Sequence, residues 1–464
     1  MDDQKVFPRV LIIGQSFDSS TGGGITMSNL FKGWPMDRLA VVSDIKYFPN
    51  ADICNQYYRL GAAEYKYVWP LSLFVKHRRI SGEVNWQVDA IEPALFSEIH
   101  RRWQNDTGHV RRETNLWNIL YKFDDLIGGE QIIRHLKLSP ALSKWTNGFC
   151  PDLIYTQAGC LHEMSLVRQF ASAFNVPYVI HMMDDWPPTL YGDKVLAPYL
   201  RRRLNREFKD LLSHSSGFMG IGQKMCEAYK ERYERDCIPF HNPLQLESWV
   251  KSTKVDWQAG TPFRMMYRGR IGTSIHTSLL EMSNAVLQLY KDGMAIQFDI
   301  IVTPSCDEPT KRLLERPGCV SVLPAVPYND VPASLASVDL LVLSYDFDPD
   351  SIKFIRYSIP TKASEYMVSG VPILVYGANE LAVVEYAKRE HWGYVVSESN
   401  GDLLKLAINR LANDPALRER LGRRAHEVAL RNHDALQVRE AFRKALVDAT
   451  CSKSRTSENA NGQR

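Results

Sequence analysis

The sequence lacks the patterns that mark zinc-binding, redox-active and membrane-spanning proteins. Its eight cysteines are scattered and none forms a Cys-x-x-Cys pair, which argues against a zinc knuckle or a redox motif and favours free thiols in a reducing compartment. No apolar run approaches the roughly 18 residues that a membrane-spanning helix needs. The N-terminal segment, Met1–Lys5, lacks the basic and then apolar pattern of a signal peptide, so we expect a cytoplasmic protein.

A strong charge of one sign is also missing. The formal net charge is +3 over 464 residues, with 45% hydrophobic and 23% charged residues, which is an ordinary globular composition. Such a chain is no polycation, so we expect no nucleic-acid partner. Its length exceeds what one ordinary core accommodates and predicts two domains.

The common glycine fingerprints of nucleotide-binding proteins are absent as well. Gly22, Gly23 and Gly24 stand between a predicted strand and a predicted helix, but the loop has no Gly-x-Gly-x-x-Gly pattern and no Walker lysine. Glycines at a helix start still allow a ligand to approach the main chain, and the N–H groups there favour negative charge. The loop is therefore either a plain turn or part of a ligand-binding cleft.

Strand-like and helix-like segments alternate in two series, which predicts an α/β protein with parallel sheets. The strands of the first series are predicted at 9–13, 39–43, 152–156, 178–181 and 217–221, and those of the second at 263–267, 296–302, 320–323, 339–344, 372–376 and 394–396. We place the domains at 1–245 and 246–432, followed by an amphipathic helix and a polar tail, 451–464, that we predict to be disordered.

The first series is interrupted at about 64–147 by a segment rich in tryptophan and arginine, which we predict to be a mostly helical insert. Its arginines come in pairs, such as Arg78-Arg79 and Arg101-Arg102. One interpretation is a solvated insert packed by its tryptophans. The other is a patch that binds an acceptor or the anionic inner face of a membrane, which would make the protein peripheral.

Residues 358–377 carry the most information about function. A loop ending in Pro360 is followed by a short predicted helix with Lys362 and Glu365, and then by a buried strand. A helix start beside a lysine can hold phosphate, and a glutamate one turn further on can accept hydrogen bonds from ribose hydroxyls. The pattern favours a nucleoside-diphosphate site over a generic joint between a helix and a strand.

The run Pro360-Thr-Lys362-x-x-Glu365-Tyr-Met-x-x-Gly370-x-Pro372 resembles the donor-site signature of GT-B glycosyltransferases, and most closely that of retaining, family-4-like members. The resemblance implies two Rossmann-like domains that face each other across a cleft, with a C-terminal helix, 433–450, that crosses back and completes the first domain. It implies a metal-independent hexosyltransferase without a cofactor. Such an enzyme moves a sugar from a nucleotide diphosphate sugar to a glycan or lipid-linked acceptor, with retention of configuration, as in polysaccharide biosynthesis.

The resemblance also assigns donor-binding residues. Arg270 and Lys362 would hold the diphosphate together with main-chain N–H groups near Thr361, and Glu365 would hold the ribose. The chain departs from the family where a second lysine should follow Arg270, because Ile275 and His276 stand there; His276 can still hydrogen-bond phosphate.

A second departure is Tyr357, which replaces a family acid eight positions before Glu365. The contact to the donor sugar is therefore unassigned. The nearby acidic loop with Asp346, Asp348 and Asp350 lacks the glycine and glutamate of a calcium loop, so it either binds sugar hydroxyls or is simply solvated.

Catalytic candidates in the first domain follow the strand at 178–181. His181 is the last residue of that strand, and Asp184 and Asp185 follow it. There they can orient an acceptor hydroxyl or stabilise an oxocarbenium-like transition state. The alternative is an aspartate that caps a helix and a histidine that packs in the core. For the whole protein, the alternatives are a sugar-nucleotide epimerase-like enzyme and a degenerate, non-catalytic binding protein.

Overall fold

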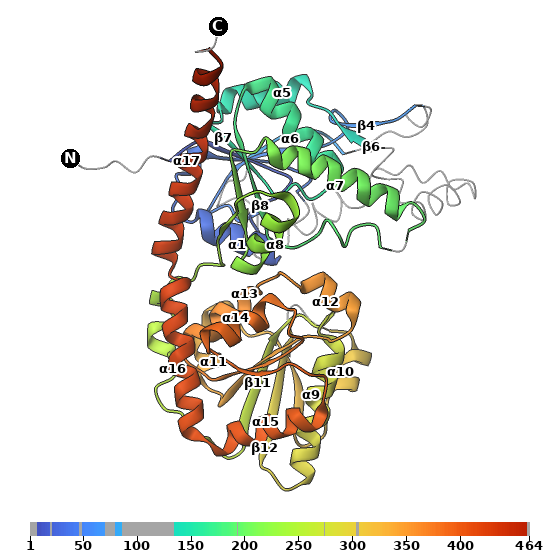
Figure 1. The fold of residues 1–464 in the computed structure, drawn as a ribbon. Helices are drawn as coiled ribbons and strands as arrows, with labels where there is room; N and C mark the ends of the chain where they lie inside the picture. The colour runs from blue at the N-terminus through green and yellow to red at the C-terminus, as the bar shows by residue number, and fades with distance from the viewer. Residues whose placement is uncertain are drawn as a thin grey trace, which may run out of the picture. The chain divides into compact units, whose positions relative to one another are not determined.

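The computed structural model describes residues 7–18, 21–45, 49–69, 79–85, 134–192, 194–272, 274–302 and 306–461. The chain forms two compact units, which we call unit 1 (Met1–Phe240 with Arg439–Arg464) and unit 2 (His241–Val438). Each unit contains one open, largely parallel sheet with helices on its faces (Figure 1), so the predicted α/β fold class is confirmed. The sequence places the corresponding boundaries after residues 245 and 432.

Unit 1 is built on an eight-stranded sheet in the order β10-β9-β8-β7-β1-β2-β3-β5, in which every neighbouring pair is parallel except β3 and β5. Its strands are β1 (Val10–Ile13), β2 (Leu39–Ser43), β3 (Gln56–Arg59), β5 (Gly82–Asn85), β7 (Leu153–Thr156), β8 (Tyr178–Met182), β9 (Gly217–Gly220) and β10 (Ile238–Pro239). The central strands β1, β2, β7 and β8 are buried along their whole length, as expected for a sheet covered on both faces.

The helices of unit 1 are α1 (Gly22–Phe31), α5 (Pro140–Phe149), α6 (Leu161–Phe174), α7 (Ala197–Ser213) and α8 (Gln223–Tyr233). The C-terminal helix, α17 (Ala435–Asn461), begins in unit 2 and continues into unit 1. Phe442 of α17 packs against Phe31, Tyr155 and Phe240, with ring centroids 5.1, 6.2 and 5.3 Å away. The last helix is therefore part of the core of unit 1.

One prediction about unit 1 is wrong, and another falls largely outside the described residues. The described parts of the predicted helical insert contain three short strands, β4 (Tyr65–Tyr67), β5 and β6 (Arg134–Leu136), besides α5; residues 70–78 and 86–133 lie outside the described residues, so its mostly helical character stays a prediction. β4 pairs with β6 and β5 pairs with β3, both antiparallel, because aromatic residues favour a half-buried strand when a partner is available. The tail predicted to be disordered from residue 451 is instead helical through Asn461, since no proline or glycine interrupts the helix before Gly462.

The prediction of free thiols is also wrong for two cysteines. Cys226 on α8 and Cys237, which precedes β10, form a disulfide with a Cα–Cα distance of 5.0 Å. The two cysteines are 11 residues apart, and the return of the chain from α8 to β10 brings them together. The spacing fits no known short motif, so the sequence carries no sign of this bond.

Unit 2 is built on a six-stranded, fully parallel sheet in the order β13-β12-β11-β14-β15-β16. Its strands are β11 (Phe263–Gly269), β12 (Ile296–Val302), β13 (Val320–Pro324), β14 (Leu340–Ser344), β15 (Ile373–Tyr376) and β16 (Tyr394–Val396). Counted along the chain, this order is 3-2-1-4-5-6, the order of Rossmann folds. In such folds ligands bind at the point where the strand order reverses. In unit 2 that position is the carboxyl end of β11 and β14.

Helices cover both faces of this sheet (Figure 1). They are α9 (His276–Lys291), α10 (Glu308–Leu314), α11 (Val331–Ala336), α12 (Pro349–Ile355), α13 (Thr361–Val368), α14 (Ala382–Glu390), α15 (Gly401–Asn413) and α16 (Pro415–Asn432). Alternate residues of β14 enter two separate cores: Leu341 and Leu343 pack with residues of α13, α14 and α16, and Leu340 and Val342 pack with residues of α9 and α15. This alternation fixes which face of the sheet α13 covers.

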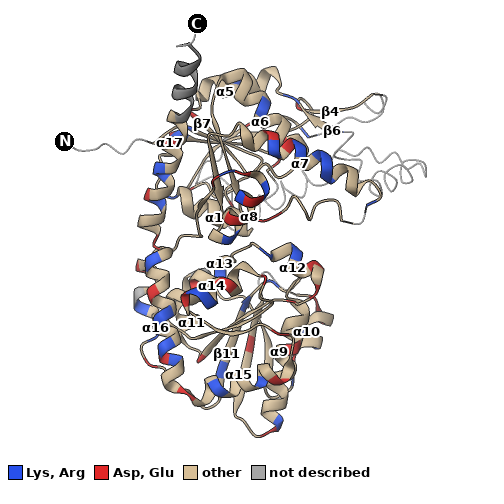
Figure 2. Cartoon of the chain, in the orientation of Figure 1, with Lys and Arg blue, Asp and Glu red and all other residues tan. Residues whose placement is uncertain are grey.

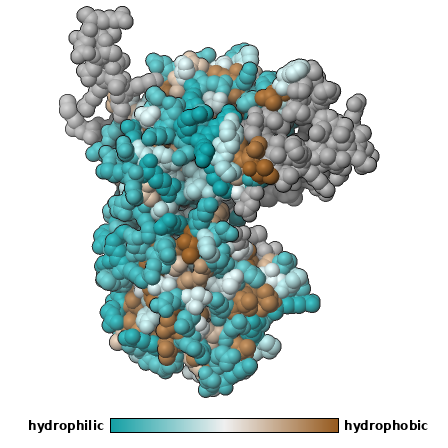
Figure 3. All heavy atoms as spheres, turned by 45° about the vertical axis from the view of Figure 1, so that its right-hand side comes forward, coloured by the Kyte–Doolittle hydropathy of each residue, from teal (hydrophilic) through white to brown (hydrophobic). Residues whose placement is uncertain are grey.

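Hydrophobic residues on the face drawn in Figure 3 form small separate patches among hydrophilic ones. No described helix combines the length and the apolar character needed to cross a bilayer.

Candidate functional site

The strongest cluster of functional groups lies in unit 2, where β11 ends and α13 begins. Because α13 leads into β15, which is parallel to β11 and β14, the start of α13 lies at the carboxyl edge of the sheet. Tyr366 fixes α13 to β11: its side chain is fully buried, and its hydroxyl accepts a hydrogen bond from the Arg268 N–H at 2.7 Å. The helix that carries Lys362 and Glu365 is thereby held against the strand that carries Arg268.

Glu365 and Arg268 form a nearly buried ion pair. Arg268 Nη1 donates to Glu365 Oε2 at 3.0 Å, and the two side chains are 15% and 11% exposed. Burial raises the pKa of Glu365, and the Arg268 guanidinium opposes this rise. Among the described residues Arg268 is the one hydrogen-bond partner of the Glu365 carboxylate, so the second carboxylate oxygen keeps its capacity to accept hydrogen bonds.

Lys362 lies one turn earlier on α13 and contacts a tyrosine of β11. Its Nζ donates to the Tyr267 hydroxyl at 2.9 Å and lies 4.2 Å from the centre of the Tyr267 ring. The pKa of Lys362 is lowered to about 7 by burial and by the nearby Arg268, while Glu365 acts in the opposite direction. A partly desolvated ammonium beside a helix start is well suited to bind an anion.

The other predicted donor-binding residues surround this cluster. Thr361 is the first residue of α13, whose N-cap, Pro360, forms no side-chain capping bond. Arg270 directly follows β11 with an exposed side chain, and its carbonyl accepts a hydrogen bond from the Tyr267 hydroxyl at 2.6 Å. Thr361, Lys362, Glu365 and Arg270 thus belong to one connected region of unit 2.

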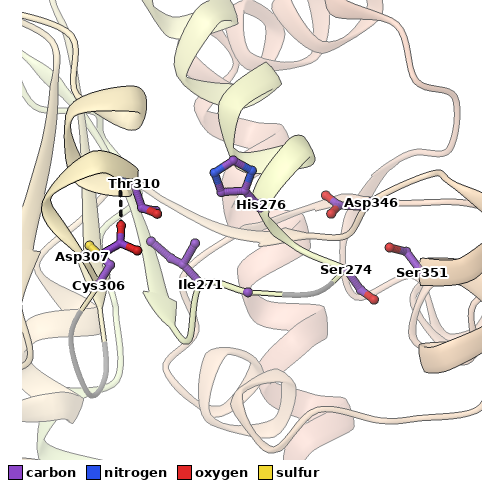
Figure 4. A pocket seen from close by; sticks show the side chains of 9 residues that line it. Ile271, Ser274, His276, Cys306, Asp307, Thr310, Asp346 and Ser351 are labelled. Atoms are coloured by element: carbon purple, nitrogen blue, oxygen red, sulfur yellow. Dashed lines mark hydrogen bonds between the residues drawn. The ribbon is translucent and has the colours of Figure 1, made fainter. Parts of the chain in front are cut away.

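His276 lies in a pocket of about 590 Å³ at the same edge of the sheet (Figure 4). The pocket is lined by residues that follow β11, β12 and β14: Ile271, Gly272, Ser274, His276, Cys306, Asp307, Thr310, Asp346 and Ser351. Figure 4 shows Ser274, Asp346 and Ser351 on one side of the pocket and Cys306, Asp307 and Thr310 on the other.

Two of the pocket carboxylates are engaged in helix capping. Asp346 accepts from the Ser278 N–H of α9 at 2.6 Å, and Asp307 accepts from the Thr310 N–H of α10 at 2.8 Å. Ser274 is 2% exposed and has a φ of 73°, and its Oγ has no hydrogen-bond partner within the described part of the chain. Such strain and an unmatched hydroxyl are typical of a ligand-binding loop. The acidic loop is thus part of a pocket at Asp346, while Asp348 caps α12 by accepting from the Ser351 N–H.

The catalytic candidates of unit 1 are held by partners inside that unit. His181 is fully buried on β8; its Nδ1 lies 2.7 Å from the Tyr155 hydroxyl, and burial lowers its pKa to about 3. Asp185 is 3% exposed and accepts three hydrogen bonds, one from Tyr229 and two from Arg232, at 2.8 to 2.9 Å. Asp184 is exposed. Their catalytic roles stay predictions.

The glycine loop forms the first turn of α1. Gly22, Gly23 and Gly24 open the helix, and Thr21 caps it by accepting from the Gly24 N–H at 2.9 Å. A Cβ atom at Gly24 would collide with the Asp18 carboxylate, which accepts hydrogen bonds from Thr21, so a larger residue there would have to displace that side chain. Gly22 has open space around it, and at Gly23 a Cβ atom would meet nothing closer than 3.7 Å.

Sequence reasoning missed Arg268 and Tyr267. Both stand next to the predicted Arg270, but the family pattern drew attention to Arg270 alone. An arginine at the end of a predicted strand, facing a glutamate on a predicted adjacent helix, is a signal that could have identified the pair.

The fold resembles several solved structures over nearly its whole length. Anabaena HepE in complex with UDP and glucose aligns with 95% of this chain and 99% of its own, at a TM-score of 0.60 and 14% identity. Sucrose-phosphate synthase from Thermosynechococcus elongatus aligns with 94% of this chain and 98% of its own, at a TM-score of 0.56 and 15% identity. The α,α-trehalose 6-phosphate synthase from Burkholderia multivorans aligns with 99% of both chains, at a TM-score of 0.54 and 11% identity.

No protein-family model and no curated protein matches the sequence. At these low identities the likeness establishes architecture. The predicted resemblance to GT-B proteins is confirmed at that level, and the chain has the GT-B fold.

Proposed function

We propose that the protein is a glycosyltransferase that moves a sugar from a nucleotide diphosphate sugar to an acceptor. The observation that carries this proposal is the cluster of Arg268, Lys362 and Glu365 at the carboxyl edge of the unit 2 sheet. It combines positive charge for a diphosphate with a carboxylate that keeps one oxygen for ribose hydroxyls. The UDP and UDP-glucose complexes of HepE, which shares the fold, support a nucleotide sugar as donor.

In this proposal unit 2 binds the donor. Glu365 accepts hydrogen bonds from the ribose, while Lys362, Arg270 and the main-chain N–H groups near Thr361 hold the diphosphate. His276 lines the neighbouring pocket, where it can hydrogen-bond a phosphate or sugar oxygen. These cations and the helix start stabilise the departing nucleoside diphosphate, which is the charge that develops in the transition state. We therefore expect no metal requirement and no cofactor.

Unit 1 is proposed to bind the acceptor, a glycan or a lipid-linked glycan, through Gly22, Gly23, Gly24 and the residues that follow β8. Asp184 is the exposed carboxylate there, so it is better placed than Asp185 to meet an acceptor. Retention of configuration and a role in polysaccharide biosynthesis rest on the sequence resemblance. Basic residues along α7 (Figure 2) are compatible with peripheral contact with an anionic membrane face; of the arginines predicted for it, Arg78, Arg101 and Arg102 lie outside the described residues.

The test is to measure donor binding by wild type and by Glu365→Ala. UDP, GDP, dTDP and CMP are screened for an increase in melting temperature, and the affinity for the best nucleotide is then measured by calorimetry. The variant should lose roughly 1–3 kcal/mol of binding free energy, since hydrogen bonds to a charged group are lost. Undiminished affinity would remove Glu365 from the ribose site.

The alternatives are separated by product analysis. A transferase forms an acceptor-dependent glycoside, whereas an epimerase-like enzyme converts or hydrolyses the nucleotide sugar without an acceptor. A degenerate binding protein would bind the nucleotide sugar and form neither product. If none of the four nucleotides raises the melting temperature, the proposed function is withdrawn and only the fold assignment stands.

A further inference from the structure

Tyr267 contacts both of the basic residues that the proposed function assigns to the diphosphate, Lys362 through its ammonium and Arg270 through its main chain. Its side chain is fully buried in β11, and its hydroxyl donates to the Arg270 carbonyl at 2.6 Å. The single hydroxyl proton is thereby used, so toward Lys362 the oxygen acts as the acceptor, and Lys362 Nζ donates to it at 2.9 Å. One buried hydroxyl thus bonds to the main chain after β11 and to the side chain of α13.

The Tyr267 ring restricts Lys362 further. Lys362 Nζ lies 4.2 Å from the Tyr267 ring centre and 6.0 Å from that of Tyr345, which follows β14. Cation–π attraction of this kind is stronger when the cation is partly desolvated. The charged groups that act on the ammonium are Arg268 of β11 and Glu365 of α13 itself. Lys362 Nζ therefore lies near two aromatic rings, one from β11 and one from the loop after β14.

Gly269 makes room for this arrangement. A Cβ atom built there would lie 3.2 Å from both Lys362 Nζ and the Tyr267 hydroxyl, closer than ordinary van der Waals contact. The residue between Arg268 and Arg270 therefore touches the tyrosine–lysine pair directly. A larger side chain at this position would displace the ammonium or the hydroxyl.

We propose that Tyr267 is a positioning residue of the donor site, whose hydroxyl holds the Arg270 main chain and the Lys362 ammonium in one fixed arrangement that fits a diphosphate. This inference rests on the proposed function, because it takes Lys362 and Arg270 as the diphosphate ligands. It adds a residue that contacts no substrate itself, and it predicts that the effect of Tyr267 is confined to ligands that carry phosphate.

The test is Tyr267→Phe, which keeps the ring and removes only the hydroxyl. Affinity for UDP or GDP, whichever the wild type binds, should fall about tenfold, because the hydroxyl no longer orients the ammonium. Affinity for the matching nucleoside, uridine or guanosine, should stay unchanged. The matched control is Tyr376→Phe: Tyr376 is also fully buried in the same sheet, but its hydroxyl bonds to Glu281, so diphosphate affinity should be kept.

A second variant shows whether the hydroxyl acts through Lys362. In a Lys362→Met background, Tyr267→Phe should cause little further loss of diphosphate affinity, because the partner of the hydroxyl is already gone. Additive losses in the double variant, or full diphosphate affinity in Tyr267→Phe alone, would overturn the inference.

A third measurement needs no nucleotide. The pH dependence of Lys362 acetylation, followed by mass spectrometry, reports the protonation of its amine. The midpoint should lie at lower pH in Tyr267→Phe than in wild type, because a hydrogen-bond acceptor for the charged form has been removed. If no nucleotide binds to the wild type, the proposed function fails, but the midpoint still tests the coupling between the Tyr267 hydroxyl and the Lys362 ammonium. A shift to lower pH in Tyr267→Phe supports that coupling, and an unchanged midpoint contradicts it.

Discussion

The six parallel strands from β3 to β9 in unit 1 and the six strands of unit 2 follow the same order, yet polar residues near the ends of the strands are used in different ways. In unit 1, Asp185 accepts three hydrogen bonds from Tyr229 and Arg232, and His181 is fully buried against Tyr155. In unit 2, Glu365 accepts one hydrogen bond, from Arg268, and the neighbouring Lys362 donates to a tyrosine hydroxyl rather than to a carboxylate. The hydrogen bonds around Asp185 in unit 1 therefore form a closed network, although His181 Nε2 has no partner among the described residues, whereas the cluster around Glu365 in unit 2 is open.

Under the proposed function, spare hydrogen-bonding capacity is what separates the donor-binding cluster of unit 2 from the Asp185 network of unit 1. A buried carboxylate whose oxygens are all occupied stabilises the fold and has little left to offer a ligand. A buried carboxylate with one partner lacks full compensation for its burial, and burial raises the pKa of Glu365 accordingly. Such incomplete compensation is expected where a ligand supplies the remaining contacts.

The sharpest test of this comparison is Arg268→Met. The variant leaves Glu365 without its partner in a nearly buried position, which should lower the free energy of unfolding by about 3–5 kcal/mol. Urea unfolding of unit 2, followed by the fluorescence of its tryptophans, measures the effect. A matched control is Arg264→Met on the same strand: its contact with Asp299 is 3.5 Å long and the Arg264 side chain is 46% exposed, so the loss should stay below about 1 kcal/mol. Equal effects of the two variants would show that the Arg268–Glu365 pair is not special.

A smaller effect is expected from Asp185→Asn in unit 1. The change removes the charge that pairs with Arg232, whose side chain is 31% exposed and can be solvated, so the loss of stability should be about 1–2 kcal/mol. Affinity for the donor nucleotide should not change, because Asp185 and the donor cluster belong to different units. A large fall in kcat at normal stability would instead give Asp185 a catalytic role and break the comparison.

Much of the fold was accessible from the sequence because apolar runs mark buried parallel strands. The strands at 39–43, 296–302 and 394–396 were predicted with the bounds that the structure has. The short strands β4, β5 and β6 were missed because each depends on a partner strand that is distant along the chain. The local sequence pattern does not indicate such a partner.

Tertiary partners account for the other omissions. Residues 251–262 look like a polar linker, but Trp257 is 8% exposed and donates to the Gly370 carbonyl at 2.9 Å. Arg418, on α16, is 2% exposed and donates to the Trp257 carbonyl. In the candidate site, Lys362 and Glu365 were singled out from local spacing. Arg268 and Tyr267 were not, since their importance lies in contacts about a hundred residues away in sequence.

A last predicted effect is a pH dependence of donor binding that arises from Lys362 in unit 2. The pKa of Lys362 in the free protein is lowered to about 7, and a bound diphosphate raises it by favouring the charged form. Below about pH 7 the lysine is charged with or without ligand, so affinity should be constant. Above it, binding requires uptake of a proton, so affinity should fall by up to about tenfold per pH unit until the pKa of the complex is reached.

Calorimetry from about pH 6 to about pH 9 with an intact nucleotide sugar avoids titration of a terminal phosphate. In Lys362→Met the affinity should be lower and the slope above pH 7 should disappear, whereas His181→Gln in unit 1 should leave the slope intact, since burial lowers the pKa of His181 to about 3 and keeps it neutral over this whole range. A slope that persists without Lys362 would mean that another group takes up the proton. That group would be sought at the carboxyl edge of the same sheet, and His276 in the adjoining pocket would be replaced first.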